Sequence, residues 1–231
     1  MLDYVYASTC DRGPLIPEPP PSAAFDHDNW EHGMEKRAAE DVLAAGWKDH
    51  RFPVTILRLP MVNSERDHFH RIQGYLLRLR DGGPILLPQG TDLPLRHVYG
   101  EDVVQAVLRL AHTSVGKGEA YNIAQDETVG LEDFLAMLAE RVGARLRLVR
   151  IPRAALDRAH LLPACSPFSD PWMSALDNAK SKAELGMKYT PLAVALDRLV
   201  QSFPARAAVL VKGYARRPLE LELARTYSRS G

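Results

Sequence analysis

A helix-like stretch from Asp28 to Trp47, placed between two strand-like runs, constrains the fold of this chain more than any other feature. Asp28, followed three residues later by Glu31, has the form of an N-terminal capping box. Apolar residues then recur at three- and four-residue intervals: Met34, Ala38, Val42 and Ala45. This spacing predicts an amphipathic helix that packs this stripe against the rest of the protein.

The same helix carries a histidine and a lysine one turn apart. His32 and Lys36 differ by four positions, so both side chains leave the same face of the helix. A positive neighbour disfavours the imidazolium form, and a neutral imidazole can accept a proton near neutral pH. The pair is therefore a candidate for proton transfer, and the alternative is an ordinary solvated helix face.

The flanking runs give this helix its context. Before it, Leu2–Thr9 is rich in β-forming residues and ends in two hydroxyl side chains; after it, Pro53–Asn63 is a second strand candidate that contains Arg58-Leu59-Pro60-Met61-Val62. A hydroxyl-ended strand, a lysine-bearing helix and an Arg-x-Pro-x-Val strand, in this order, resemble the extended short-chain dehydrogenase/reductases, the NAD-dependent epimerase/dehydratase family. In that family the three elements surround the nicotinamide.

The resemblance implies a role for individual residues of this chain. Ser8 or Thr9 would orient the substrate, and Lys36 would hold the nicotinamide ribose. Pro60 and Val62 would lie beside the cofactor. His32 stands four residues before Lys36, where the family has its catalytic tyrosine. Histidine can act as a base, but its ring ends closer to the backbone than a tyrosine hydroxyl does, and catalysis is sensitive to displacements of about 1 Å.

Further matches follow along the chain. Arg96-His97-Val98 precedes Asp102 in an Arg-x-Val-x-x-x-Asp pattern, in which the family's arginine often meets substrate phosphate. Arg96 is thus a candidate substrate ligand, with a surface ion pair as the alternative, and Asp102 is expected to cap a helix. Tyr121-Asn122-Ile123 and the segment from Lys180 to Gly186 also resemble the family.

Other helices and strands are expected from periodicity and end signals. A helix capped by residues 64–67 should bury Phe69, Ile72, Tyr75, Leu76 and Leu79 and end at Gly82. The helix after Asp102 should turn Val103, Val104, Val107, Leu108 and Ala111 inward. Further helices are expected over 131–142, 177–186 and 192–203, and strands over 84–88, 119–124 and 145–151. The stripe of Leu219, Leu223 and Tyr227 needs a surface, either on this chain or on another subunit.

A phosphate-binding turn is missing from the sequence. No Gly-x-Gly-x-x-Gly or Gly-x-x-Gly-x-x-Gly occurs anywhere in the 231 residues. The resemblance thus begins partway through the family's pattern and leaves Leu2–Ala7 as an apolar sheet edge. Three explanations stay open: the chain is truncated, a homodimer or a partner chain covers the edge, or the chain's own helices do. NAD and NADP are not distinguished, because the missing segment carries that difference.

Composition excludes several classes of protein. Twenty-nine basic and twenty-nine acidic residues balance, which disfavours nucleic acid as a partner. No apolar run approaches the roughly 20 residues that span a bilayer, and no metal-ligand spacing occurs, since Cys10 and Cys165 are far apart and His68 and His70 lie on different helix faces. We expect a cytoplasmic protein with reduced cysteines.

These observations predict an α/β protein with a partial Rossmann-like parallel sheet, corresponding to the second half of that fold, and a smaller α/β C-terminal substrate-domain portion. The expected division is 1–125 for the NAD(P)-binding half, 126–204 for the substrate-domain portion and 205–231 for a helical tail. The expected function is NAD(P)-dependent hydride transfer on a small-molecule substrate, sugar-nucleotide-like or another hydroxy or keto compound. The alternative is a truncated or degenerate member that acts as a non-catalytic binding or assembly module.

Overall fold

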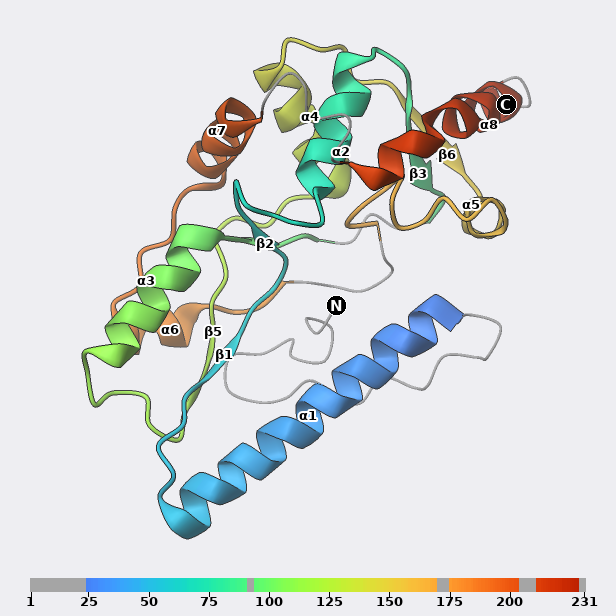
Figure 1. Cartoon of the computed structure of the whole chain (residues 1–231). Helices are drawn as coiled ribbons and strands as arrows, with labels where there is room; N and C mark the ends of the chain where they lie inside the picture. The colour runs from blue at the N-terminus through green and yellow to red at the C-terminus, as the bar shows by residue number, and fades with distance from the viewer. Residues whose placement is uncertain (1–23, 91–93, 170–174, 204–210, 229–231) are drawn as a thin grey trace. The chain divides into compact units, whose positions relative to one another are not determined.

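The computed structural model describes residues 24–90, 94–169, 175–203 and 211–228, and it divides the chain into two compact units (Figure 1). Each unit is assembled from three separate stretches of sequence. Unit 1 comprises residues 1–63, 96–128 and 172–191, and unit 2 comprises residues 64–95, 129–171 and 192–231. The contiguous domain boundaries expected above stay a prediction.

Among its described residues, unit 1 has two pairs of parallel strands. Its elements are α1 (Ala24–His50), β1 (Ile56–Arg58), β2 (Val62–Asn63), β4 (Val98–Tyr99), α3 (Gly100–Ala111), β5 (Ala120–Asn122) and α6 (Ala179–Leu185). β1 pairs with β5, with Arg58 opposite Asn122, and β2 pairs with β4. Pro60 separates β1 from β2, so the run expected as one strand is two, because proline cannot donate to a ladder. Parallel strands joined through helices confirm the α/β, partial Rossmann-like fold.

Helix α1 forms as predicted, but it is longer and turns a different face inward. It begins at Ala24, so the expected capping box at Asp28 lies inside the helix. Three of the four residues of the expected stripe are wrong: Val42 is 72% exposed, and Ala38 and Ala45 are exposed too, whereas Met34 is half-buried. From Gly33 to Trp47, the buried or half-buried positions are Gly33, Met34, Arg37, Glu40, Leu43, Gly46 and Trp47. Hydrophobic periodicity missed this face because its central residue is a charged side chain, Glu40.

Helix α3 is also rotated relative to the expectation. Val103 packs on the core of unit 1 as predicted, whereas Val104, Val107 and Leu108 are about half exposed. The carboxylate of Asp102 accepts hydrogen bonds from the backbone N–H and the hydroxyl of Thr190, at 2.9 and 2.8 Å. Asp102 therefore does not cap the helix; it points inward, and this contact fixes which face of α3 meets the core.

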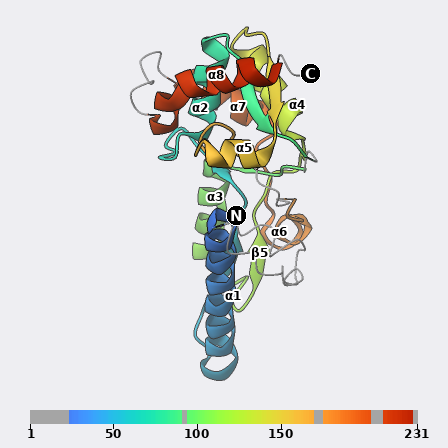
Figure 2. The same cartoon turned by 90° about the vertical axis from the view of Figure 1, so that its right-hand side faces the viewer.

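Unit 2 is built on one parallel pair of strands. Its elements are α2 (Arg71–Arg80), β3 (Ile85–Pro88), α4 (Leu131–Arg141), β6 (Leu148–Ile151), α5 (Arg153–Arg158), α7 (Leu192–Ser202), the 3₁₀ helix η3 (Lys212–Arg216) and α8 (Arg217–Ser228). β3 pairs with β6, and α8 packs against β6 (Figure 2). The helices over 131–142 and 192–203 and the strands over 84–88 and 145–151 are confirmed.

One helix end differs from the prediction and another agrees with it. α2 begins at Arg71, not within 64–67, and Asp67 accepts hydrogen bonds from the backbone N–H groups of Phe69 and Arg71. Phe69, expected inside, is 62% exposed. At the other extreme, Gly186 ends α6 in the left-handed conformation, φ 62°, as its position predicts.

The C-terminal helix finds its surface on the chain itself. Leu219, Leu223 and Tyr227 of α8 pack against the core cluster of unit 2, which includes Leu86 and Ile151. This settles the choice left open by the sequence in favour of this chain rather than another subunit.

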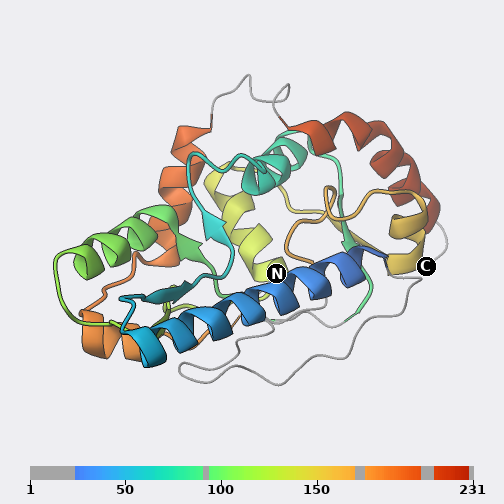
Figure 3. The same cartoon turned by 60° about the horizontal axis from the view of Figure 1, so that its bottom comes forward.

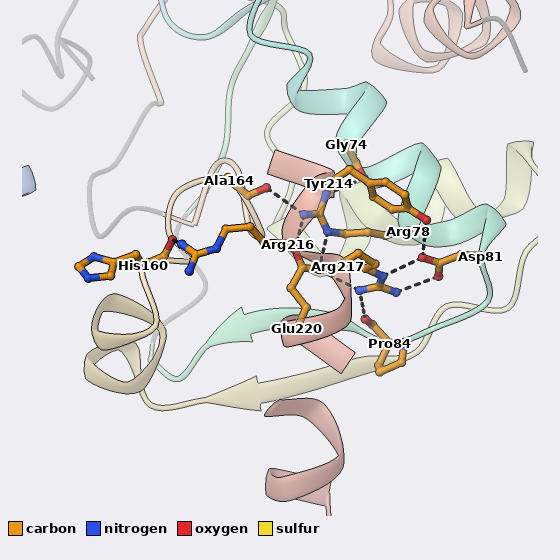
Figure 4. Close-up of polar contacts among 10 residues, drawn as sticks. All are labelled: Gly74, Arg78, Asp81, Pro84, His160, Ala164, Tyr214, Arg216, Arg217 and Glu220. Atoms are coloured by element: carbon orange, nitrogen blue, oxygen red, sulfur yellow. Dashed lines mark hydrogen bonds and ion pairs between the residues drawn. The ribbon is translucent and has the colours of Figure 1, made fainter. Parts of the chain in front are cut away.

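A buried ionic cluster ties α8 to α2 (Figure 4). Arg78 of α2, with no exposed surface, donates from Nε to Glu220 of α8 at 2.9 Å. Arg217 donates to Glu220 and, through two nitrogens, to the carboxylate of Asp81 at 2.7 and 2.8 Å. Tyr214 donates to Asp81 at 2.9 Å. Each buried charge thus meets an opposite charge, which is the condition for burying it without a large penalty.

Candidate functional site

The site predicted from the sequence depends on where α1 lies against β1. Glu40 of α1 accepts hydrogen bonds from Nε and Nη2 of Arg58, at 3.1 and 2.8 Å. Both residues are 8% exposed. A two-point carboxylate–guanidinium contact fixes orientation as well as distance. The arginine of the Arg-x-Pro segment therefore anchors the helix that carries the candidate lysine.

The direction of the two elements then places Lys36. α1 runs antiparallel to β1 (Figure 1; Figure 3). Arg58 is the last residue of β1, and Lys36 lies one helical turn before Glu40 on the same face. Lys36, and His32 one turn further, consequently lie toward the carboxyl end of the β1–β5 pair. Ligands of open α/β sheets bind outside the carboxyl ends of the strands.

Both candidate side chains are accessible. His32 and Lys36 are exposed, although Lys36 occupies the same helix face as the buried Glu40. Ser8 and Thr9, the hydroxyl residues of the predicted site, lie outside the described residues. Lys36 thus lies toward the carboxyl end of the β1–β5 pair. A site formed by Ser8, Thr9, His32 and Lys36 together stays a prediction.

A polar pair that sequence reasoning did not identify lies just beyond β1. Asn63, at the end of β2, and His97, before β4, are 4% and 2% exposed, and Nδ2 of Asn63 is 2.8 Å from Nδ1 of His97. An amide donor at Nδ1 suits the ring tautomer that carries its proton on Nε2. Within the described residues, Oδ1 of Asn63 has no hydrogen-bond partner. No sequence signal links these residues, which are 34 positions apart.

Pro60 and Val62 lie in the same short region. Pro60 is buried and Val62 half-buried, and Val62 pairs with Val98 in the β2–β4 ladder. Their predicted place beside a nicotinamide stays a prediction, consistent with their position directly after β1.

Arg96 is engaged within unit 1. Its Nε donates to the hydroxyl of Thr128 at 3.0 Å, and Nη1 donates to the carbonyl oxygen of Leu176 at 2.7 Å. These bonds hold the segment before β4 to two other loops. The role of Arg96 as a substrate ligand stays a prediction.

Tyr121 of β5 cannot easily replace the missing catalytic tyrosine. Its ring is fully buried, and its hydroxyl donates to the carboxylate of Glu184 at 2.7 Å. Burial, reinforced by the nearby negative charge of Glu184, raises the pKa of Tyr121 well above its ordinary value. A phenol held protonated in this way is a poor base, so His32 remains the candidate on α1.

The described residues fit one end of a nicotinamide dinucleotide only. A lysine at the carboxyl end of parallel strands suits the nicotinamide ribose, but the sequence offers no glycine-rich turn for the pyrophosphate. No group of three metal-ligating side chains is found among the described residues. None of the described helices combines the length and apolar character needed to cross a membrane.

Comparison with protein families gives one match that covers about half of the chain. Residues 3–124 match the model of the NAD dependent epimerase/dehydratase family. A search of curated proteins gives no match.

Solved structures share the fold at low sequence identity. UDP-glucose 4-epimerase of Thermotoga maritima, solved with UDP-glucose, is 22% identical with a TM-score of 0.61 over 74% of this chain and 52% of the epimerase. UDP-glucuronic acid 4-epimerase of Bacillus cereus, in complex with NAD, is 19% identical with a TM-score of 0.62 over 91% and 59%. dTDP-glucose 4,6-dehydratase of Streptomyces venezuelae, with NAD bound, is 20% identical with a TM-score of 0.62 over 90% and 59%. The chain thus spans between half and three fifths of the length of these proteins.

Proposed function

Because this chain belongs to the NAD-dependent epimerase/dehydratase family, we propose that it serves an NAD(P)-dependent oxidoreductase reaction on a sugar-nucleotide-like or other hydroxy or keto substrate. The observation that carries the proposal is the Glu40–Arg58 contact, which sets Lys36 and His32 at the carboxyl end of the β1–β5 pair. The solved structures support the cofactor class, since those of Bacillus cereus and Streptomyces venezuelae hold NAD.

Each candidate residue has a defined task in this proposal. The ammonium group of Lys36 donates hydrogen bonds to ribose hydroxyls and, being positive, favours the neutral form of His32. A ring nitrogen of His32, directly or through one water, accepts the proton of the substrate hydroxyl. The hydroxyl of Ser8 or Thr9 orients that substrate group. A bound nicotinamide supplies the hydride acceptor or donor.

The pyrophosphate end of the cofactor needs other residues. Since no glycine-rich turn occurs in the sequence, binding of the whole cofactor needs residues from a partner chain. A second copy of this chain would lack the same turn, so the proposal invokes a different chain.

Cofactor binding tests Lys36 directly. The chain, purified together with the proteins that bind it in its own cells, is titrated with NADH and NADPH, and binding is followed by nicotinamide fluorescence. Lys36→Ala should weaken binding about tenfold, equivalent to about 1.4 kcal/mol. Lys48→Ala is the matched control, because Lys48 is exposed near the other end of the same helix. Equal affinities for both variants and the unaltered chain would contradict the role of Lys36.

Turnover tests His32. NAD⁺ or NADP⁺ is supplied with UDP-glucose or dTDP-glucose as probe substrates, and sugar products are separated by chromatography. His32→Ala should reduce turnover by a factor of about 10² to 10⁴, the usual loss when a general base is removed. His50→Ala, at the exposed end of α1, is the control. Turnover that survives His32→Ala undiminished would exclude this base.

A non-catalytic binding or assembly module is the second candidate. It is favoured by two features of the sequence, the histidine in place of the family's tyrosine and the missing glycine-rich turn. Binding of NADH without turnover of any probe substrate, by the chain alone and together with proteins that co-purify with it, would favour this candidate over the enzyme.

A further inference from the structure

Two adjacent grooves lie in unit 2, beside the amino ends of β3 and β6. The larger, of about 720 Å³, lies between β6 and α8; the second, of about 680 Å³, lies between the ends of α2 and α4. Both are lined by Arg145 and Arg147, so the two grooves meet at the segment that leads into β6.

The lining of both grooves is positively charged. Arg225 adds a third guanidinium to the larger groove, and Arg80 adds one to the smaller. Among the residues that the structure describes, neither lining includes an aspartate or a glutamate. The chain as a whole has no net charge, so four arginines without an acidic residue are a local excess.

These cations are not neutralised by the part of the chain that the structure describes. Among the described residues, the side chains of Arg145, Arg147 and Arg225 make no ion pair. Asp81, the acidic residue closest in sequence to Gly83 of the lining, is occupied by Arg217 through two hydrogen bonds. Like charges that share a cleft raise its positive potential and attract anions.

Two separate segments of the chain bring arginines to the larger groove. Arg145 and Arg147 lie two residues apart in the segment that leads into β6, and both are exposed, whereas Leu146 between them is half-buried. Across the larger groove, α8 presents one face through residues at helical spacing: Leu221, Ala224, Arg225 and Ser228. The larger groove therefore combines three arginines with an apolar wall on α8 that includes Leu221 and Ala224.

We propose that this basic double groove binds a diphosphate group, either as inorganic pyrophosphate or as part of a nucleotide. Guanidinium groups contact phosphate oxygens in pairs, and closely spaced arginines suit closely spaced phosphate charges. The size of the larger groove falls within the range of small-molecule sites, and its apolar wall can accept a base. All residues that line the groove belong to unit 2, whereas Lys36 and His32 of the candidate nicotinamide site belong to unit 1, so the two sites use different residues.

Titration calorimetry with inorganic pyrophosphate and with ADP tests the proposal on the full chain. The variant Arg145→Gln/Arg147→Gln/Arg225→Gln should lose at least about tenfold in affinity for both probes, because it removes three phosphate contacts. A control with the same change in net charge is Arg66→Gln/Lys117→Gln/Arg158→Gln, whose side chains are exposed elsewhere. The control should keep its affinity, and circular dichroism checks that both variants are folded.

The outcomes separate the alternatives. Equal affinity for pyrophosphate and ADP would show that the groove contacts the diphosphate alone. Tighter binding of ADP would show that the apolar wall also contacts the nucleoside. Both outcomes support the proposal. Lys36→Ala should leave both affinities unchanged, because Lys36 belongs to the other site. The proposal is overturned by equal losses in the groove variant and the control, by dependence on Lys36, or by binding of an oligoglutamate peptide but of neither phosphate probe.

Discussion

The carboxylate of Glu40 on α1 accepts two hydrogen bonds from the guanidinium of Arg58 on β1, and both side chains are buried. This contact joins a helix to the strand that follows it along the chain. It gives α1 its rotation, and that rotation decides which residues of the helix reach the carboxyl end of the strands.

Removing one member of this pair should destabilise unit 1. Glu40→Gln removes the carboxylate charge that faces the buried guanidinium of Arg58, and we expect a loss of about 3 kcal/mol in the free energy of unfolding. Glu31→Gln, exposed on the same helix, should change it by less than about 0.5 kcal/mol. Urea unfolding followed by circular dichroism compares the two. A similar, small effect of both changes would show that the buried pair contributes little.

The Arg78–Glu220 pair should behave in the same way in unit 2. Glu220→Gln should cost about 3 to 5 kcal/mol, because it leaves both Arg78 and Arg217 without their buried partner. Glu222→Gln, two residues further along α8 and exposed, is the control. The double change Arg78→Met/Glu220→Gln should cost less than the sum of the single changes in a double-mutant cycle. Strict additivity would contradict the coupling.

Because of Asp81, the free energy of unfolding should depend on pH in the acidic range. Burial opposes its ionisation, but hydrogen bonds from Arg217, from the backbone of Gly83 and from Tyr214 outweigh burial and hold the pKa of Asp81 below its ordinary value. A carboxyl group whose pKa is lower in the folded protein stabilises the fold at pH values above its pKa in the unfolded chain, about 3.9. This stabilisation is lost as the pH falls through the pKa of the group in the folded protein. The stability difference between the unaltered chain and Asp81→Asn should thus be full near pH 7 and shrink below about pH 4. A difference independent of pH would contradict this.

Gly118 should not tolerate a side chain. It has φ +80°, and a Cβ there would lie 2.0 Å from Nε1 of Trp47. Gly118→Ala should therefore lower the free energy of unfolding for two reasons. The new methyl group overpacks against Trp47, which costs about 1 to 3 kcal/mol, and a residue other than glycine is strained at this positive φ. Gly143→Ala is the matched control, because Gly143 has φ +62° with open space around it and should show the strain alone. Thermal melts of the two variants measure the difference, and equal melting temperatures would exclude a close Trp47 contact.

Cys165 should be unreactive in the folded protein. Burial, with the negative charge of Glu220 nearby, raises the pKa of its thiol to about 12, so almost no thiolate forms near pH 8. In a Cys10→Ser background, labelling by a thiol reagent should follow the opening of unit 2 and accelerate in Glu220→Gln. Rapid labelling without denaturant would show that the thiol is accessible.

Local pattern predicted much of the secondary structure. The helices over 131–142 and 192–203, the turn at Gly186 and the strands over 84–88 and 145–151 were predictable because each depends on neighbours in sequence. The parallel pairing joins distant segments, such as Ile56 with Ala120, and was expected only from the resemblance to the family. The family, too, was predictable from the order of its segments, and residues 3–124 match its model.

The faces of the helices were not predictable in the same way. Counting apolar positions on α1 selected Val42 and on α3 selected Val104, and both are exposed. Glu40 and Asp102 point inward instead, because Arg58 and Thr190 provide the partners that make a buried carboxylate favourable. Such partners lie 18 and 88 residues away and leave no periodic signal.

The sequence by itself determined the family, the order of helices and strands, and the candidates Lys36 and His32, because these depend on residue types at short spacing. Only the tertiary structure decided that Glu40 turns Lys36 toward the carboxyl end of β1, that α8 packs on its own chain, and that Arg145, Arg147 and Arg225 line one groove. These relationships join distant segments, and their energy comes from desolvated charges and packed surfaces that form only when those segments meet.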